Sequence, residues 1–227
     1  MIGFGNTSVN GIDTAIRSMR MPLQSFSKSD SKWDTSYSEY VDDCPIIIGK
    51  NDLDLAHRLL STGSDSDSKF LRSIQVYTEI TAPTYFFGEL DTYKIGTVRN
   101  SSSLQHTGMK RDYVPNDFAI DESRPYAGIG LSESECDLRT IIQIVNKWRQ
   151  KYKDTNDYTY FRIMRQLMPS GYLYTASWTA NYQVLRTIWK QRVKQPHRLE
   201  EWKMFGTWIK ELPYAKDLIT WEGEKHD

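Results

Sequence analysis

A short stretch of the sequence, Asp91–His106 (DTYKIGTVRNSSSLQH), gathers side chains of the kinds that bind anions. Its cations are Lys94 and Arg99, and its amide and hydroxyl donors are Asn100, Ser101, Ser102, Ser103 and Gln105. Recognition of a phosphate needs a cation and several donors that converge on it. Gly96 adds a position at which the backbone can approach a ligand closely. The stretch therefore indicates a phosphate-binding site, or else an ordinary solvated loop of small polar residues.

A second group of candidate residues lies in the stretch RQLMPSGYLYTASWTANYQVLRTIWKQR, residues 165–192. Arg165 stands just before the break at Pro169, and Asn181 and Arg192 follow on one expected helix. Asn181 and Arg192 are about three helical turns apart, so we expect their side chains to share a face. Such a Trp- and Tyr-rich helix is either core with a polar edge or one wall of an anion site, because a buried arginine needs a partner.

Other kinds of catalytic chemistry have little support in the sequence. His57 lies in an amphipathic helix, where a packed histidine is the ordinary interpretation, and His197 stands in an expected surface turn beside a proline. Cys44 and Cys136 form no CxxC motif and have no histidine at ligand spacing, which argues against a metal site. The sequence also lacks a phosphate-binding loop, a dinucleotide fingerprint and a Gly-x-Ser-x-Gly motif. We therefore assign no catalytic residue.

The composition favours a cytoplasmic protein that binds neither nucleic acid nor membranes. The 227 residues suffice for one domain. The 29 basic and 29 acidic side chains balance, so the chain has no long-range attraction for a polyanion. We find no apolar run long enough to span a membrane and no signal-peptide pattern. Aromatic residues make up 13% of the chain, which suits a large core, a subunit interface or a stacking platform for a ring ligand.

Most of the elements that would position the candidate residues are predicted to be helices. Apolar residues spaced three and four apart predict them over residues 52–61, 68–79, 132–152, 157–168, 179–193 and 199–211. The first has an Asn51 cap and a Gly63 stop, the second meets a break at Pro83, and the third opens with a capping box, Ser132 and Glu135. Residues 46–48 and 96–99 are strand candidates, and the polar segment 1–45 is expected to be irregular. The predicted class is a single helix-rich α+β domain.

Taken in order, these features resemble the flavin-dependent thymidylate synthases, and more closely phage-type proteins distantly like them. The resemblance covers roughly residues 52–211. It is strongest in FLRSIQVYTEITAPTYFFGELDTYK and in residues 165–192, where Arg165 and Arg192 match the family's C-terminal pattern.

The family's signature is Arg-His-Arg-x-x-Ser-x-Asn-Glu-x-Ser-x-Arg-Tyr, with a Gln a few residues upstream. Laid on this chain without gaps, its opening triplet falls on Thr92, Tyr93 and Lys94. Its remaining named positions fall on Thr97, Arg99, Asn100, Ser102, Leu104 and Gln105, and the upstream region holds Glu89. The basic third position and the hydroxyls are retained. In the family, the basic residues of the triplet help to bind the flavin, whereas the serines and the later arginines bind the nucleotide phosphate. The substitutions at Thr92 and Tyr93 therefore affect the residues implied for the flavin more than those implied for the nucleotide.

The resemblance implies a flavin-dependent-thymidylate-synthase-like fold, a homotetramer and a nucleoside monophosphate ligand such as dUMP. The residues implied for the nucleotide are Lys94, Arg99, Ser101, Ser102, Arg165, Asn181 and Arg192. Those implied for FAD, if the flavin is retained, are His57, Tyr93 and Lys94. Two functions stay open: a divergent transferase that methylates or otherwise modifies a pyrimidine base, or a non-catalytic phage protein that sequesters or senses a nucleotide. A structural or interaction protein with a vestigial pocket is the third alternative.

Overall fold

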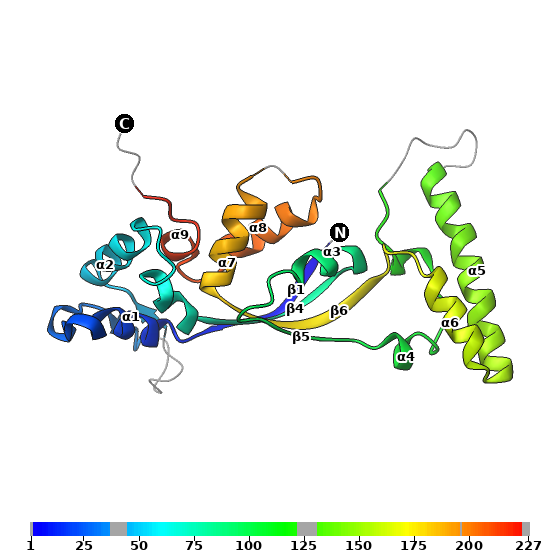
Figure 1. The fold of residues 1–227 in the computed structure, drawn as a ribbon, viewed down its shortest axis with the longest axis horizontal. Helices are drawn as coiled ribbons and strands as arrows, with labels where there is room; N and C mark the ends of the chain where they lie inside the picture. Colours follow the sequence, from blue (N-terminus) through cyan, green and yellow to red (C-terminus); the bar gives the residue numbers. More distant parts are fainter. Residues whose placement is uncertain (1, 37–44, 122–130, 196, 224–227) are drawn as a thin grey trace. The chain divides into compact units, whose positions relative to one another are not determined.

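The computed structural model describes residues 2–36, 45–121, 131–195 and 197–223. It confirms the helix-rich α+β class (Figure 1). The chain divides into two compact units. Unit 1 holds residues 1–3, 80–92 and 100–177, and unit 2 holds residues 4–79, 93–99 and 178–227.

The main sheet has four strands in the order β1-β4-β6-β5. Their bounds are Gly3–Asn10 (β1), Gln75–Pro83 (β4), Val98–Ser101 (β5) and Leu173–Asn181 (β6). A separate antiparallel pair joins β2 (Lys32–Trp33) to β3 (Ile46–Ile47), which confirms the strand expected near residue 46.

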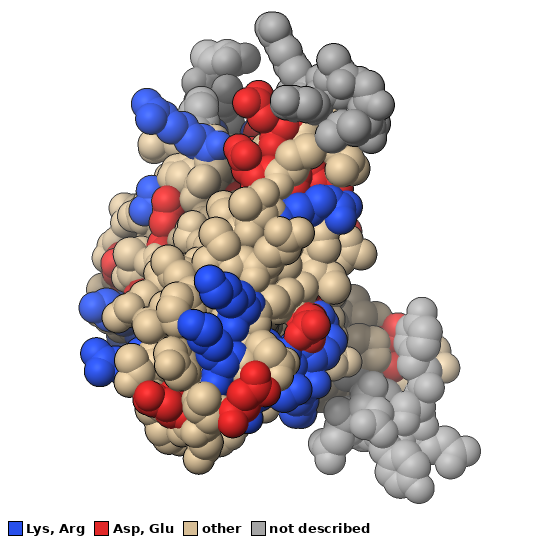
Figure 2. Space-filling model, turned by 90° about the vertical axis from the view of Figure 1, so that its right-hand side faces the viewer, with Lys and Arg blue, Asp and Glu red and all other residues tan. Residues whose placement is uncertain are grey.

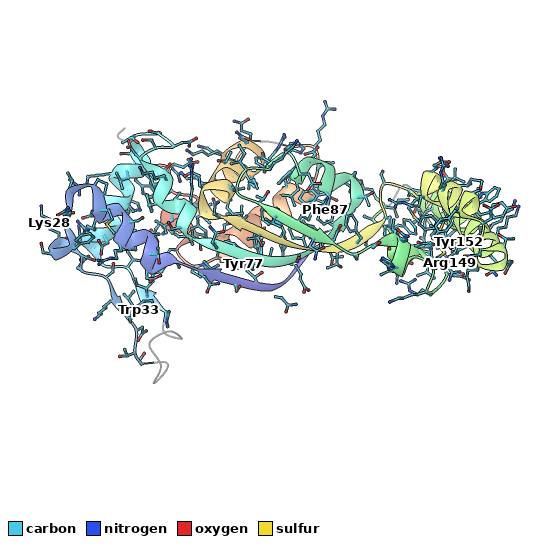
Figure 3. All side chains as sticks on the ribbon, turned by 60° about the horizontal axis from the view of Figure 1, so that its bottom comes forward. Lys28, Trp33, Tyr77, Phe87, Arg149 and Tyr152 are labelled. Atoms are coloured by element: carbon cyan, nitrogen blue, oxygen red, sulfur yellow. The ribbon has the colours of Figure 1, made fainter. Side chains whose placement is uncertain are left out.

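The helix predicted over residues 68–79 is wrong. A 3-10 helix, η4 (Ser68–Ser73), is followed by strand β4. Val76, Thr78 and Ile80 are buried, whereas Tyr77 between them is exposed (Figure 3). Burial thus alternates with a period of two, and β-branched residues occupy the buried positions, which favours a strand. The apolar residues three and four apart in this stretch belong partly to η4 and partly to β4.

Unit 2 begins with regular structure where an irregular segment was expected. Strand β1 is followed by helix α1 (Ile12–Arg20) and by the short 3-10 helices η1 (Met21–Leu23) and η2 (Phe26–Lys28). Ile12, Ala15, Ile16 and Met19 form the buried stripe of α1. The serine-rich run at residues 23–36 led to the prediction of an irregular segment, although α1 before it contains a single serine. Residues 37–44 lie outside the described part of the chain.

Helix α2 (Lys50–Ser61) confirms the helix predicted from residue 52, but its cap is not Asn51. The carboxylate of Asp30 accepts hydrogen bonds from the backbone N–H of Asn51 (2.9 Å) and of Asp52 (3.2 Å). Gly49 at the N-cap permits this approach, since a Cβ there would lie 2.2 Å from Asp30 Oδ1. The cap comes from a residue distant in sequence, so local pattern could not identify it.

Buried aromatic and aliphatic side chains form the core of unit 2. Its largest members include Leu71, Tyr182, Leu185, Ile188, Trp202 and Phe205. They come from η4 and from two C-terminal helices, α7 (Tyr182–Ile188) and α8 (Glu201–Glu211). The π-helical segment η6 (Trp189–Val193) follows α7 directly and has no buried residue. A last short helix, α9, spans Ala215–Leu218. The helix predicted to start at residue 179 therefore starts at 182, because residues 173–181 belong to β6.

Unit 1 consists largely of a helical hairpin. Helix α5 (Glu133–Thr155) packs beside α6 (Tyr158–Leu167), and both were predicted (Figure 1). The Ser132 side chain accepts from Glu135 N at 3.2 Å, as the capping box predicted. Between them α5 and α6 bury Leu138, Ile142, Val145, Phe161 and Met164. The described part of this unit also contains α3 (Thr84–Leu90), α4 (Leu104–Thr107) and the 3-10 helix η5 (Pro115–Asp117).

The face shown in Figure 2 carries basic and acidic side chains interspersed. Within the described residues, no helix combines the length and the apolar character needed to cross a membrane.

Candidate functional site

The Tyr93–Gly96 turn lies against the C-terminal end of η6 in unit 2. The Tyr93 hydroxyl is 3.1 Å from Gln191 Oε1, to which it donates, and it accepts from Arg192 Nε at 3.2 Å. The Tyr93 ring meets buried Trp202 edge-on, with centroids 6.2 Å apart. Two sequence-predicted residues, Tyr93 and Arg192, are therefore in direct contact.

Asn181 approaches the other end of the same turn. It is the N-cap of α7, and its side-chain oxygen accepts from Val184 N at 3.1 Å. A Cβ on Gly96 would lie 2.7 Å from Asn181 Nδ2, and Gly96 has φ +78°, so glycine is favoured there on both counts. Asn181 was expected on the same helix as Arg192, but it is the last residue of β6 and precedes α7. Asn181 and Arg192 nevertheless both contact the Tyr93–Gly96 turn.

Aromatic and basic groups surround the Arg192 guanidinium. Its central carbon lies 5.9 Å from the Trp202 ring centroid, and Nη1 lies 3.4 Å from His197 Nε2. His197 Nδ1 accepts from Leu199 N at 3.1 Å. His197, expected in a surface turn, is instead half-buried beside Arg192. We call Tyr93, Gly96, Asn181, Arg192, His197 and Trp202 the Arg192 cluster.

The other residues predicted for the nucleotide fall in both units. Lys94 is exposed on the Tyr93–Gly96 turn, and Arg99 is half-buried in β5 of unit 2. Ser101, Ser102 and Arg165 are exposed in unit 1, where Ser102 N donates to Thr175 O at 3.0 Å. Within unit 2 the structure thus brings together two residues predicted for the nucleotide, Asn181 and Arg192, with Tyr93, which was predicted for the flavin.

His57, predicted for the flavin, lies in a different place from Tyr93. Its imidazole stacks on the indole of Trp221, with centroids 4.3 Å apart and planes at 10°. Its Nε2 is buried and has no hydrogen-bond partner among the described residues. Both rings line a cavity of about 1050 Å³, with Arg20, Lys28, Asn51, Asp54, Arg58, Ser61, Glu222 and Gly223. Tyr93 and Lys94 do not line it, so the predicted flavin residues occupy two places.

Unit 2 also contains a small polar pocket with a buried arginine in its wall, neither of which was predicted from the sequence. This pocket, of about 220 Å³, is lined by Leu60, Gly63, Asp65, Ser68, Gln183, Arg186, Thr187, Lys190 and Gln191. Arg186 is only 5% exposed, whereas the predicted Arg192 is half-buried. Burial lowers the pKa of the Lys190 ammonium from its ordinary value. The available signal for the burial of Arg186 was Tyr182, an aromatic residue one turn earlier on the same face of α7.

The described residues contain no group of three histidine, cysteine, aspartate or glutamate side chains placed to hold a metal ion. Cys136 is a free thiol, and Cys44 lies outside the described residues.

The chain is similar in fold to two kinds of nucleotide enzyme. Thymidylate synthase X (ThyX) from Helicobacter pylori, solved with FAD and dUMP, superposes with a TM-score of 0.63 over 96% of this chain and 97% of its own, at 16% sequence identity. A second structure of that flavin-dependent enzyme with FAD and dUMP gives a TM-score of 0.60, at 16% identity over 93% and 94% of the two chains. The UMP/dUMP methylase PolB from Streptomyces cacaoi, bound with 5-Br dUMP, gives 0.57, at 16% identity over 97% and 95%.

No protein-family model matches the sequence, and no curated protein is similar to it at the level of sequence. The structural likeness extends over nearly the whole length of each chain, and it confirms the predicted ThyX-like fold.

Proposed function

We propose that this ThyX-like chain binds a pyrimidine nucleoside monophosphate such as dUMP and modifies its base, as a divergent methylase-like transferase. Its fold is shared with structures solved with dUMP or with a brominated analogue. The observation that carries the proposal is the contact of Arg192 with Tyr93, which places the guanidinium at the turn that the signature region forms.

The Arg192 guanidinium is held by two of its three nitrogens. Nε donates to the Tyr93 hydroxyl, and Nη1 faces His197. No hydrogen bond within the described residues uses Nη2, which leaves a donor for a phosphate or a pyrimidine carbonyl. Guanidinium groups suit such acceptors because their donors are fixed in a plane. In this proposal Lys94, on the same turn, adds a second cation.

Arg99, in β5 of the same unit, adds a further cation to this proposed phosphate set. Three other residues are proposed for the phosphate from the family resemblance alone, and all lie in unit 1: Ser101, Ser102 and Arg165. Two of these, Ser101 and Ser102, supply hydroxyl donors at the end of β5. We also propose that the active form is a homotetramer in the cytoplasm, of the host cell if a phage encodes the chain. Light scattering on the purified protein tests the oligomeric state.

The residues around His57 fit a large cofactor such as FAD. The cavity is about 1050 Å³, its walls include the basic residues Lys28 and Arg58, and His57 Nε2 is buried without a partner. A bound flavin would supply the reducing chemistry that converts a transferred one-carbon group to methyl. His57, Lys28 and Arg58 would hold it; what this chain contributes is a stacked imidazole and two cations.

The alternative function, nucleotide binding without catalysis, is favoured by one feature of the sequence. Thr92 and Tyr93 stand where the family's signature has Arg and His. If these substitutions abolish flavin binding, the Arg192 cluster would still hold a nucleotide, and the chain would sequester or sense it.

Isothermal titration with dUMP tests the proposal directly. Removing a charged partner of a phosphate costs on the order of 2–5 kcal/mol, so Arg192→Ala and Arg165→Ala should each weaken binding by about 30-fold or more. Arg198→Ala, an exposed neighbour, serves as the control. Unchanged dUMP affinity in a folded Arg192→Ala protein would remove the Arg192 cluster from the site. A second assay distinguishes the two candidate functions. Conversion of bound dUMP in the presence of FAD, a reductant and a one-carbon donor would support the enzyme, and binding without conversion would support the non-catalytic nucleotide-binding protein.

A further inference from the structure

One face of α5 carries acidic, apolar and basic side chains in that order along the helix. Residues four and seven positions apart lie on the same side of an α-helix, because seven residues make nearly two turns. Glu133, Asp137, Ile144 and Lys151 are spaced in this way, and Ile141 lies beside them. We call these five residues the α5 stripe.

The α5 stripe lies on a different side of the helix from the core of unit 1. The buried residues Leu138, Ile142 and Val145 belong to the side of α5 that faces this core and α6 (Figure 1). The stripe is open instead: Ile141 is 40% and Ile144 is 43% exposed, and the three charged members are exposed as well. Two neighbouring isoleucines give this helix face an apolar centre that is available for contact with another molecule.

The charged ends of the α5 stripe have no counter-ion within the described residues. None of the ion pairs in the described part of the chain includes Glu133, Asp137 or Lys151. The Lys151 ammonium instead lies over the ring of Trp148, 4.6 Å from its centroid. The helix dipole acts over the first and last turns, so it accounts for Glu133 but not for Asp137 and Lys151, which lie further in.

The α5 stripe is complementary to its own reversed copy. Ile144 is the central residue of α5, and Asp137 and Lys151 lie seven residues before and after it. If two copies of α5 meet antiparallel, with a two-fold axis at Ile144, Asp137 of each copy lies opposite Lys151 of the partner subunit. A parallel pair would instead place like charges side by side, which is unfavourable. A two-fold interface needs a surface of this self-matching kind.

We propose that the α5 stripe is an interface between two copies of this chain, which pair antiparallel through α5. The isoleucines form its apolar centre, and two symmetry-related pairs of Asp137 with Lys151 flank the centre, about 10 Å from the axis. One pair of facing helices is a small interface. By itself it should therefore give a dissociation constant on the order of micromolar.

Charge reversal tests the pairing, with the oligomer mass measured by sedimentation equilibrium at low ionic strength. Asp137→Lys and Lys151→Asp should each raise the dissociation constant about tenfold or more, because each places like charges opposite one another twice. The double variant Asp137→Lys/Lys151→Asp restores opposite charges and should associate like wild type. Gln143→Lys, at an exposed position outside the stripe, is the control and should also associate like wild type.

Three results of this experiment would overturn the proposal. The first is a wild-type chain that stays monomeric at all concentrations. The second is association of both single variants with the wild-type constant. The third is a double variant that associates as weakly as the single ones, because the opposite charges would then be restored without effect.

Disulfide cross-linking determines the direction of the two helices. In a Cys44→Ser/Cys136→Ser background, Ile144→Cys should cross-link two copies on oxidation, since its two copies meet at the axis. Thr140→Cys, also exposed on α5, is the matched control. In an antiparallel pair its two copies are offset by about 12 Å along the helix, beyond the reach of a disulfide. Cross-linking at both positions would indicate a parallel pair, and cross-linking at neither would indicate no contact between the two helices; either result overturns the proposal.

The outcomes also separate this inference from the proposed homotetramer, which names no contact surface. A wild-type tetramer whose mass does not respond to the charge variants would keep the homotetramer and reject the α5 interface. A wild-type dimer that dissociates in the single variants and forms again in the double variant would support the α5 interface and reject the homotetramer. The titration of dUMP against Arg192→Ala tests the nucleotide site separately, because the Arg192 cluster contains no residue of α5.

Discussion

The guanidinium of Arg192 donates from Nε to the hydroxyl of Tyr93 at 3.2 Å, which ties the signature region to the end of a π-helical segment. Tyr93→Phe should remove this bond together with the bond to Gln191, and reduce the unfolding free energy by about 1 kcal/mol. A double-mutant cycle with Arg192→Ala, followed by urea unfolding, should give a coupling energy of about 0.5–3 kcal/mol. Strict additivity of the two changes would show that the contact does not form in solution.

Gly96→Ala should reduce the unfolding free energy by more than the backbone strain at residue 96 alone would. The new Cβ would lie 2.7 Å from Asn181 Nδ2, in a backbone conformation with φ +78°. Gly63→Ala is the matched control, because Gly63 has φ +71° and nothing lies within 4 Å of its Cβ position. The control should lose about 1–2 kcal/mol of stability from strain alone. Gly96→Ala should lose more, and should also weaken dUMP binding; equal losses and equal affinities would contradict the arrangement.

Asp52→Asn should destabilise unit 2 by about 3–5 kcal/mol in chemical unfolding. Asp52 is fully buried; its Oδ1 pairs with Arg20 at 2.7 Å, and its Oδ2 accepts from the hydroxyls of Ser29 (2.7 Å) and Ser31 (2.6 Å). Asp54→Asn, which breaks an exposed pair with Lys50, should cost less than about 1 kcal/mol. Similar losses in both variants would contradict the buried role of Asp52.

The same carboxylate should make stability fall in acid. Burial raises the pKa of Asp52, but the hydrogen bonds from Ser29, Ser31 and Arg20 outweigh burial and hold the pKa below its ordinary value. A group whose pKa is lower in the folded than in the unfolded chain stabilises the fold above the unfolded pKa, and this is lost as the pH falls through the folded pKa. The unfolding free energy should therefore drop below about pH 4 in the wild type, and less steeply in Asp52→Asn.

Arg149→Ala should destabilise unit 1 by about 3 kcal/mol, measured by thermal unfolding. Arg149 is 2% exposed on α5 (labelled in Figure 3). Its Nε donates to Gly108 O at 3.1 Å, its Nη2 to Met109 O at 2.8 Å, and its Nη1 pairs with Asp112. Lys147→Ala, on the exposed face of the same helix, should change stability by less than about 0.5 kcal/mol. A mild effect of Arg149→Ala would mean that the 108–112 segment does not depend on this side chain.

The sequence by itself determined the elements whose signals are local. The capping box at Ser132 and the apolar spacing after it predicted α5, and the spacing in residues 52–61 predicted α2, because helix periodicity and first-turn hydrogen bonds involve neighbours in sequence. The order of such features was also enough to indicate the ThyX-like fold. Asn181 and Arg192 could be named as candidates from their types and positions, whereas Tyr93 was named from the resemblance to the family's signature.

Only the tertiary structure decided which of these residues meet. The strand β4 replaced an expected helix because its alternating side chains are buried by partners far along the chain, and Asp30 replaced Asn51 as the cap of α2 across about twenty residues. The burial of Arg186 rather than Arg192, the position of His197 beside Arg192, and the stacking of Trp221 on His57 all depend on where α7, η6 and the C-terminal segment pack. Contacts of this kind join residues that no window of sequence contains together, so they follow from the packed fold and not from local pattern.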